Sequence, residues 1–225
     1  MGSEAQNYDV IIVGGAVIGS SIAWHLTGRD DFKGRVLVIE KDPNYEFCST
    51  ALSAASIRQQ FSTPINIEMS AYGIDFLRNL KRDLDPDVDI SLHEKGYLVL
   101  ATDDGRDILR HNHATQTEFG GDIVWMEPDE LAAKYPWMNT SDLAAGCWGR
   151  TGEGWFDAYC LMQSFRKQAR RRGADYIDGE VVKVVRDGDQ ITGIVLKDGR
   201  RFGCGELVNA AGTGCSKLAK MAGLE

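Results

Sequence analysis

The residues of this chain whose types and spacing could do chemistry are three glycines and one acid near the N-terminus. Gly14, Gly15 and Gly19 follow the short apolar run 10–13, and Glu40 closes a second apolar run about 20 positions after Gly19. An apolar run of this length is typical of a buried parallel strand. The spacing predicts a strand, a tight turn, a helix and a second strand, which is the arrangement that binds a dinucleotide.

Each part of this pattern has a physical role in binding. The N–H groups at the start of a helix are unpaired and the helix dipole is positive there, so this end attracts a pyrophosphate. Glu40 can accept hydrogen bonds from the hydroxyl groups of an adenosine ribose, and its charge disfavours a cofactor that carries a 2′-phosphate. The alternative is a strand–helix–strand unit that binds no ligand.

Ala16 is a departure from the pattern, which has glycine at positions 14, 16 and 19. At the middle position the backbone comes closest to the pyrophosphate. If the φ angle of Ala16 is positive, its side chain costs about 1 kcal/mol. If φ is negative, the methyl group mainly crowds the phosphate. We expect weaker binding of the cofactor in either case, but not its loss.

The elements that must position these residues follow from the apolar periodicity. Strands are predicted at 10–13 and 36–39, with a helix between them at 17–26 that Gly28 ends. A further helix is predicted from Thr63 and Pro64 onward, and its apolar residues recur at helical spacing. We expect this stripe to lie in the core. It consists of Ile65, Met69, Tyr72, Phe76 and Leu80.

The rest of the chain is predicted to be a small α+β insert and a β-meander. The insert follows an acidic loop at 83–89, a long helix begins at Asp157, and Asp-Gly turns then separate short strands. The small residues Ala210–Gly212, which leave a buried strand, are a second place where backbone and ligand could approach closely. The predicted strands lie at 97–101, 123–125, 143–148, 174–177, 180–186, 190–196, 200–202 and 206–209.

The composition argues against several classes of function. The net charge of −8 and the pI of about 5.1 disfavour a nucleic-acid-binding protein, which needs a basic surface. We expect no membrane span, because no apolar run is long enough. The five cysteines form no CxxC pair, which predicts reduced thiols in an intracellular protein. His111 and His113 point to different sides of a helix, so we expect no metal site.

Five stretches of the chain share their residues with a known family. They are Asp9–Gly19, Ile39–Lys41, Ser49–Thr50, Gly96–Leu100 and Val208–Gly212. Together they resemble the D-amino-acid-oxidase-like superfamily of FAD-dependent oxidoreductases, which includes sarcosine, dimethylglycine and glycine oxidases. The resemblance implies an α/β fold with a Rossmann-like FAD-binding domain, a β-meander crossover and a partial α+β substrate domain. The FAD-binding domain would comprise residues 1–84 and 152–225, and the substrate domain residues 85–151.

The resemblance also implies which residues hold FAD. The glycine turn would bind the pyrophosphate, the residues after 48 would line the path toward the flavin, and Val182 would meet the adenine end through its backbone. The candidate cofactor-binding residues are Gly14, Gly15, Ala16, Val17, Ile18, Gly19, Glu40, Lys41, Ser49, Thr50, Ser53, Ala54, Ala55, Ser56, Ile57, Arg58, Val182, Ala210, Ala211 and Gly212. Arg58 is a candidate contact for the flavin or for a substrate carboxylate. A surface salt bridge is the alternative role for Arg58.

Three functions are open at this point. The resemblance implies oxidation of an amine or amino acid of the sarcosine, dimethylglycine or glycine kind, by hydride transfer to flavin. Residues 49–62 and 153–157 are similar to a subgroup linked to the assembly of respiratory complex I, which implies a non-catalytic FAD-binding assembly factor. The third function is an NAD-dependent dehydrogenase, because the opening unit serves both cofactors. The flavin-like segments 49–50 and 209–212 count against it.

Members of the superfamily continue well beyond the segment that resembles 208–212. We therefore expect this chain to be the N-terminal part of a larger enzyme, to bind FAD poorly by itself and not to turn over amines. The expected partners are a small amine or amino-acid substrate and a C-terminal complement or protein partner that supplies the rest of the substrate chamber.

Overall fold

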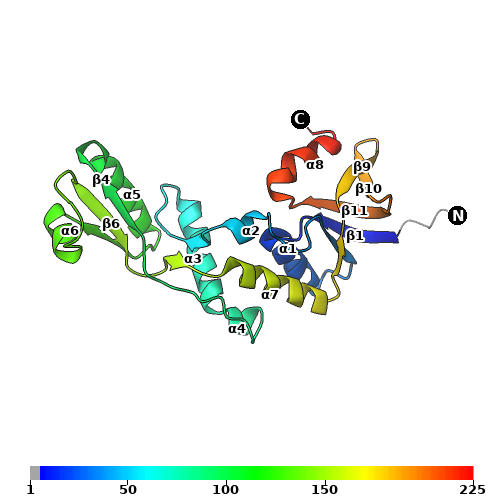
Figure 1. Cartoon of the computed structure of the whole chain (residues 1–225), viewed down its shortest axis with the longest axis horizontal. Helices are drawn as coiled ribbons and strands as arrows, with labels where there is room; N and C mark the ends of the chain where they lie inside the picture. The colour runs from blue at the N-terminus through cyan, green and yellow to red at the C-terminus, as the bar shows by residue number, and fades with distance from the viewer. Residues whose placement is uncertain (1–5, 225) are drawn as a thin grey trace. The chain divides into compact units, whose positions relative to one another are not determined.

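The structure is a computed structural model that describes residues 6–224 (Figure 1). The chain forms two compact units, each with its own β-structure. Unit 1 consists of Met1–Ser53 and Ala158–Glu225, and unit 2 consists of Ala54–Asp157.

Unit 1 is built on a six-stranded mixed sheet with the strand order β8-β2-β1-β11-β10-β9. β1 pairs in parallel with β2 and β11, whereas β11, β10 and β9 form an antiparallel meander. The strands are β1 (Gln6–Val13), β2 (Val36–Glu40), β8 (Asp175–Asp178), β9 (Val181–Asp187), β10 (Gln190–Leu196) and β11 (Arg201–Asn209). Because Val13 pairs with both Ile39 and Asn209, the carboxyl ends of β1, β2 and β11 lie side by side at one end of the sheet. The predicted α/β fold with a meander is confirmed.

Helices cover both faces of this sheet. α1 (Val17–Thr27) packs against α7 (Ala158–Arg171) and meets the sheet where Gly19 lies close to Ile12. α8 (Cys215–Met221) packs on β9 and β11, and its Leu218 joins an apolar core with Ile11 and Ile39. The short helix α2 (Ser49–Leu52) comes after β2 in the chain, and the 3-10 helix η2 (Gly212–Gly214) comes after β11. The alternation of Ile11 and Ile12 thus assigns the two faces to different helices.

Unit 2 contains two small antiparallel sheets. One has the strand order β4-β6-β5, and the other pairs β3 with β7. The strands are β3 (Ser56–Ile57), β4 (Leu98–Ala101), β5 (Ile123–Met126), β6 (Ala145–Gly149) and β7 (Gly154–Trp155). The helices are α3 (Pro64–Arg78), α4 (Leu80–Asp83), η1 (Asp103–Gly105), α5 (Arg106–Glu118) and α6 (Pro128–Lys134). α5 covers one face of the three-stranded sheet, where Leu109, Ile123 and Cys147 form a buried cluster.

The prediction that the apolar stripe on α3 is buried in the core is wrong for most of its residues. Ile65, Met69 and Tyr72 are 55%, 65% and 68% exposed. The buried residues of α3 are Ile67, Ile74 and Leu77 instead. The helix carries two apolar faces, and helical spacing alone does not say which one the protein buries.

The compact units do not follow the predicted domain boundaries. α3 lies in unit 2, where it packs against β3 and α5, whereas residues 1–84 were predicted to belong together. The strands predicted at 200–202 and 206–209 are one continuous strand, β11, which pairs with β1 along its length. The division into FAD-binding and substrate segments remains a prediction about function.

Neither a membrane-spanning helix nor a cluster of metal-binding side chains occurs in residues 6–224. No helix there is long and apolar enough to cross a bilayer. No group of three or more His, Cys, Asp or Glu side chains in the same residues is arranged to hold a metal ion.

Candidate cofactor-binding site

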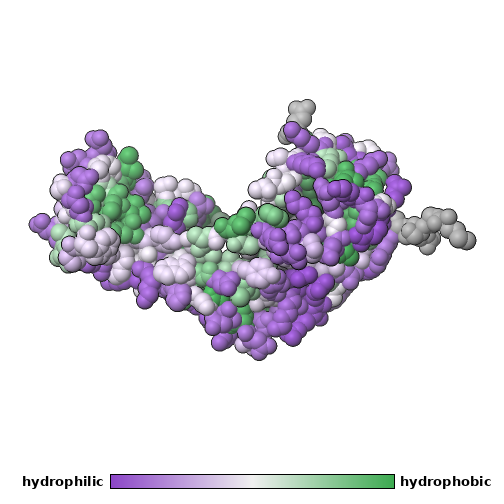
Figure 2. All heavy atoms as spheres, viewed as in Figure 1, coloured by the Kyte–Doolittle hydropathy of each residue, from purple (hydrophilic) through white to green (hydrophobic). Residues whose placement is uncertain are grey.

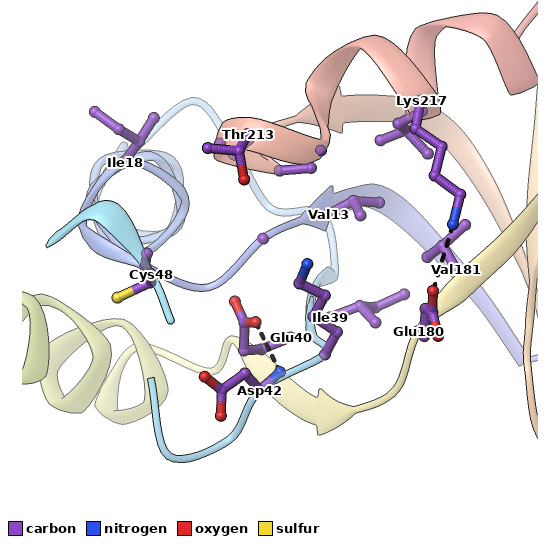
Figure 3. A pocket seen from close by; sticks show the side chains of 18 of the residues that line it. Val13, Ile18, Ile39, Glu40, Asp42, Cys48, Glu180, Val181, Thr213 and Lys217 are labelled. Carbon is purple, nitrogen blue, oxygen red and sulfur yellow. Dashed lines mark hydrogen bonds and ion pairs between the residues drawn. The ribbon is translucent and has the colours of Figure 1, made fainter. Parts of the chain in front are cut away.

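A pocket of about 210 Å³ opens in unit 1 at the carboxyl ends of β1, β2 and β11. The turn after β1 forms its floor, and the residues after β2 and β11 form opposite walls (Figure 3). Helix α8 supplies a further wall through Lys217, Leu218 and Met221. Every residue that lines the pocket belongs to unit 1.

The glycines of the turn are required by close backbone packing. Gly14 has φ +104°, and a Cβ atom added to it would lie 2.2 Å from the carbonyl oxygen of Ala210. A Cβ atom on Gly19 would lie 1.8 Å from the carbonyl oxygen of Gly14. Contacts this short are impossible, so any side chain at either position displaces α1 or β11 from the turn.

The peptide groups of Gly15 are held on both sides. Its N–H donates to Oε2 of Glu40 at 2.7 Å, and its carbonyl oxygen accepts from the hydroxyl of Ser20 at 2.7 Å. Ser20 is completely buried and in turn accepts from the hydroxyl of Tyr176 at 3.2 Å. Gly15 therefore fixes the turn, and the first N–H groups of α1 are the ones that can meet a phosphate.

Glu40 stands at the end of β2 with its carboxylate oriented by two backbone donors. Oε2 accepts from Gly15, and Oε1 accepts from the N–H of Asp42 at 2.9 Å. The residue is 9% exposed and lines the pocket. A carboxylate has about four acceptor positions, so two are left for the hydroxyl groups of a ribose.

Tyr45 is a buried residue beside Gly15. It is 1% exposed, has φ +60°, and its hydroxyl oxygen would lie 3.0 Å from a Cβ atom on Gly15. Burial raises the pKa of Tyr45 to about 12, so the phenol is neutral at physiological pH. Its carbonyl oxygen accepts from the thiol of Cys48 at 3.3 Å, which ties the loop after β2 to the start of α2.

Ala16 has φ −69° and precedes the first residue of α1. Of the two cases considered for this residue, the structure has the one without backbone strain. Ala16 lines the pocket, so its methyl group occupies space on the side where a phosphate would approach.

α2 lies beside the N-terminus of α1. The hydroxyl oxygen of Thr50 accepts from the N–H of Val17 at 3.4 Å, and both Ser49 and Thr50 line the pocket. Two hydroxyl groups thus stand next to the helix end that attracts an anion.

The segment after β11 forms the opposite wall. The N–H of Ala210 donates to the carbonyl oxygen of Val13 at 2.9 Å, which continues the pairing of β11 with β1 beyond the strand. The side chain of Asn209 accepts from Ala211 at 3.3 Å and donates to the carbonyl oxygen of Cys215 at 2.8 Å. Asn209 therefore fixes the turn that brings Ala210, Ala211 and Gly212 into the pocket wall.

The end of the pocket farthest from the glycine turn is apolar with a charged rim. Val181 lines it and is 8% exposed, whereas Val182 is 41% exposed and does not line it. A register shift explains the difference, because Val195 pairs with Lys183 while Leu196 pairs with Val181. Val182 is the extra residue of a β-bulge, which breaks the alternation along the strand.

At the rim of this end, an ion pair joins two walls. The ammonium group of Lys217 on α8 lies 3.5 Å from the carboxylate of Glu180, which precedes β9 (Figure 3).

The structure brings half of the predicted site residues to the pocket. Those that line it are Gly14, Ala16, Ile18, Glu40, Lys41, Ser49, Thr50, Ala210, Ala211 and Gly212. Gly15, Val17, Gly19, Ser53 and Val182 are in unit 1 but do not line it. Ala54, Ala55, Ser56, Ile57 and Arg58 belong to unit 2.

Several pocket residues were missed by the sequence analysis. They include Val13, Ile39, Cys48, Gly179, Glu180, Val181, Lys217, Leu218 and Met221. Val13 and Ile39 are the last apolar residues of predicted strands and could have been included on that ground. The residues of α8 had no signal, because their approach depends on how the meander folds back.

Arg58 carries an exposed guanidinium group that lies 4.8 Å from the ring centre of Phe61. Within residues 6–224 it forms no ion pair, so the salt bridge considered as its alternative role is not present there. The carbonyl oxygen of Arg58 accepts from the hydroxyl of Ser70 at 2.5 Å.

These features fit the adenosine and pyrophosphate portion of FAD. A turn whose glycines leave no room for a Cβ atom against the neighbouring backbone, a helix N-terminus, an oriented carboxylate and an apolar end follow one another along the pocket. The order matches a pyrophosphate, a ribose and a flat base.

Comparison with known proteins agrees with this geometry. The chain is 39% identical to FAD-dependent oxidoreductase domain-containing protein 1 of Xenopus laevis over 243 aligned positions, which cover 97% of this chain and 49% of that protein. The structure is similar to that of L-proline dehydrogenase from P. horikoshii, with a TM-score of 0.84, 25% identity, and coverage of 98% of this chain and 57% of the other. Glycine oxidase from Geobacillus kaustophilus has a TM-score of 0.81 and 26% identity, with coverage of 98% and 60%.

The chain spans about half the length of the curated relatives it matches. The sequence profile of the family described as FAD dependent oxidoreductase matches residues 9–225, which is nearly the whole chain. The chain therefore belongs to the FAD dependent oxidoreductase family, the DAO family.

Proposed function

We propose that this chain binds FAD and belongs to an enzyme that oxidises an amine or amino acid of the sarcosine, dimethylglycine or glycine kind. The observation that carries the proposal is the oriented carboxylate of Glu40 beside the turn of Gly14 and Gly15, at the N-terminus of α1. The similarity to proteins named glycine oxidase and L-proline dehydrogenase supports this substrate class.

The residues of the chain would divide the work of binding. The first N–H groups of α1, with the hydroxyl groups of Ser49 and Thr50, would hold the pyrophosphate. Glu40 would accept from the ribose, and the apolar end near Val181 would take the adenine. Arg58 would receive a substrate carboxylate in a paired hydrogen bond. When bound, FAD would supply the hydride acceptor.

An absorbance spectrum followed by anaerobic mixing tests the proposal. The purified protein is kept in excess FAD, because binding by this chain alone is expected to be weak, and it is expected to show the absorbance band of bound oxidised flavin at about 450 nm. Sarcosine, proline and glycine are then mixed in without oxygen, and bleaching of the band reports oxidation of the amine. A protein that retains no FAD would contradict the cofactor assignment.

A second candidate is a non-catalytic FAD-binding assembly factor, as the similarity of residues 49–62 and 153–157 to the assembly-linked subgroup implies. Exposed apolar side chains favour it, because such surfaces bind other proteins. Ile65, Met69 and Tyr72 are exposed on α3, and Figure 2 shows further apolar atoms at the surface of unit 2 over β4 and α5. Bound FAD without bleaching by any amine, in this chain and also in a version extended to the length of its relatives, would favour this candidate.

The partner and the compartment are also proposals. A C-terminal complement or a separate protein would cover the exposed apolar side chains and complete a substrate chamber. The cytoplasm or the mitochondrial matrix would keep the five cysteines as free thiols, the state they have in the structure. The DAO family assignment disfavours the NAD-dependent alternative.

A further inference from the structure

Glu153 is a fully buried carboxylate that accepts four hydrogen bonds in unit 2. Oε1 accepts from the backbone N–H groups of Gln59 at 2.7 Å and Gln60 at 3.1 Å. Oε2 accepts from the side-chain amide of Gln60 at 2.9 Å and from the N–H of Tyr97 at 3.1 Å. The residue is 0% exposed, so these donors replace all of its contacts with water.

The surrounding backbone is shaped around this carboxylate. A Cβ atom on Gly149 would lie 1.9 Å from Oε2 of Glu153. Gly152 has φ +74°, and a Cβ atom there would lie 2.6 Å from the side-chain nitrogen of Gln59. Both positions therefore require glycine, which shows that the protein leaves room for the carboxylate and its partners.

The segment that Glu153 holds is the one that presents Arg58. Just before Arg58, β3 pairs with β7, the strand that directly follows Glu153. Just after it, the N–H groups of Gln59 and Gln60 are bound by the carboxylate. The backbone on both sides of Arg58 is thus fixed, while its guanidinium group is exposed and forms no ion pair within residues 6–224.

We infer that Glu153 is a positioning residue for Arg58, and that it holds the backbone from which the guanidinium group of Arg58 receives a substrate carboxylate. The inference rests on the proposed function, in which Arg58 makes that contact. Without the carboxylate, up to four N–H donors lose their acceptor in the interior, and the segment must move to bring them to water. The backbone of Arg58 would then lose its fixed position even though the arginine side chain is unchanged.

A double-mutant cycle separates positioning from a purely structural role. The variants are Glu153→Gln, Arg58→Gln and the combination of both, each loaded with FAD. The probe is acetate, a small carboxylate, and its dissociation constant is measured by isothermal titration calorimetry. Each single substitution is expected to raise the dissociation constant about tenfold, the size of effect of one charge-assisted hydrogen bond. The combined variant is expected to match Arg58→Gln.

Glu127→Gln is the matched control. Glu127 is another carboxylate of unit 2 that accepts from Trp125 and Arg106, but it has no contact with the segment 56–61. This substitution is expected to lower the stability of unit 2 and to leave the affinity for acetate unchanged. If Glu153→Gln does not fold, Gln60→Met takes its place in the cycle. It keeps the carboxylate and its backbone donors, and it removes the side-chain bonds of Gln60 to Oε2 of Glu153 and to the carbonyl oxygen of Tyr97.

The outcomes distinguish the inference from the proposed function. If the increases in the dissociation constant of acetate caused by Glu153→Gln and Arg58→Gln multiply in the combined variant, the inference is overturned. An unchanged affinity for acetate in either single variant also overturns it. Failure of the unsubstituted protein to bind FAD overturns the proposed function, and the inference falls with it. If the protein binds FAD and the combined variant has the same dissociation constant for acetate as Arg58→Gln, the result supports both the inference and the proposed function.

Discussion

The carboxylate of Glu40 accepts a hydrogen bond from the backbone N–H of Gly15 at 2.7 Å. The acid at the end of β2 thus holds the glycine turn at the end of β1. The residue whose spacing predicts a ribose contact also fixes the loop that would meet the pyrophosphate. Binding of the ribose and of the pyrophosphate of FAD would therefore be coupled through one side chain.

Glu40→Gln is expected to raise the dissociation constant of FAD about tenfold or more, since a charged acceptor is lost. An amide has a single acceptor oxygen, so its NH2 group must face the N–H of Gly15 or that of Asp42. Fluorescence titration with FAD measures the effect. Glu118→Gln, at an exposed position of α5, is the control and should bind as the unsubstituted protein does. Equal affinity in Glu40→Gln would contradict the assignment.

Gly14→Val and Gly19→Val are each expected to abolish FAD binding. Their side chains would overlap the backbone of Ala210 and of Gly14 respectively. The flavin content after purification in excess FAD is the measurement. Gly188→Ala is the control, because Gly188 also has a positive φ, +58°, but no atom lies within 4 Å of its added Cβ. Full flavin occupancy in either valine variant would show that the turn does not hold the cofactor.

Ala16→Gly is expected to keep or tighten the affinity for FAD. The methyl group of Ala16 lines the pocket, and its φ of −69° means that no backbone strain is relieved by the change. Glycine at this helix-capping position costs only a few tenths of a kcal/mol relative to better caps, so the fold should persist. A clear loss of affinity in the titration would mean that the methyl group supports the turn.

The stability of the protein is expected to fall as the pH rises from 9 toward 11. Burial raises the pKa of the Cys147 thiol from 9.0 to about 11. The unfolded chain therefore ionises this thiol at a lower pH than the folded protein does, and the contribution of Cys147 is present below pH 9 and lost above it. Urea unfolding at pH 8 and at about pH 10.5 measures the change. Cys147→Ala should lower stability at both pH values but show a smaller fall between them.

The parts of the fold that the sequence predicts well are local. The strand that ends at Val13, the turn at Gly14 and the acid at Glu40 lie within one strand–helix–strand unit, so spacing alone relates them. Glu40 and Gly15 meet because β1 and β2 are neighbours and run in parallel.

The parts that the sequence does not predict depend on distant partners. Val181 lines the pocket and Val182 does not because of a bulge against β10, and two adjacent valines look alike in the sequence. On α3, the choice between Ile67 and Met69 as core depends on which elements pack against the helix. Glu153 lacked a signal as a structural residue, because its partners lie more than 50 positions away in the chain.

The pairing of β1 with β11 has a consequence for the order in which the protein folds. Unit 2 is one continuous stretch, Ala54–Asp157, so all of its strand pairs can close as soon as that stretch has left the ribosome. Unit 1 has to wait, because Val13 needs Asn209 as its neighbour in the sheet. Until then the apolar strand 10–13 lacks its partner on one side, and the closing of so long a loop is slow. Unit 2 begins to be synthesised after unit 1, but it is the first unit that can fold completely.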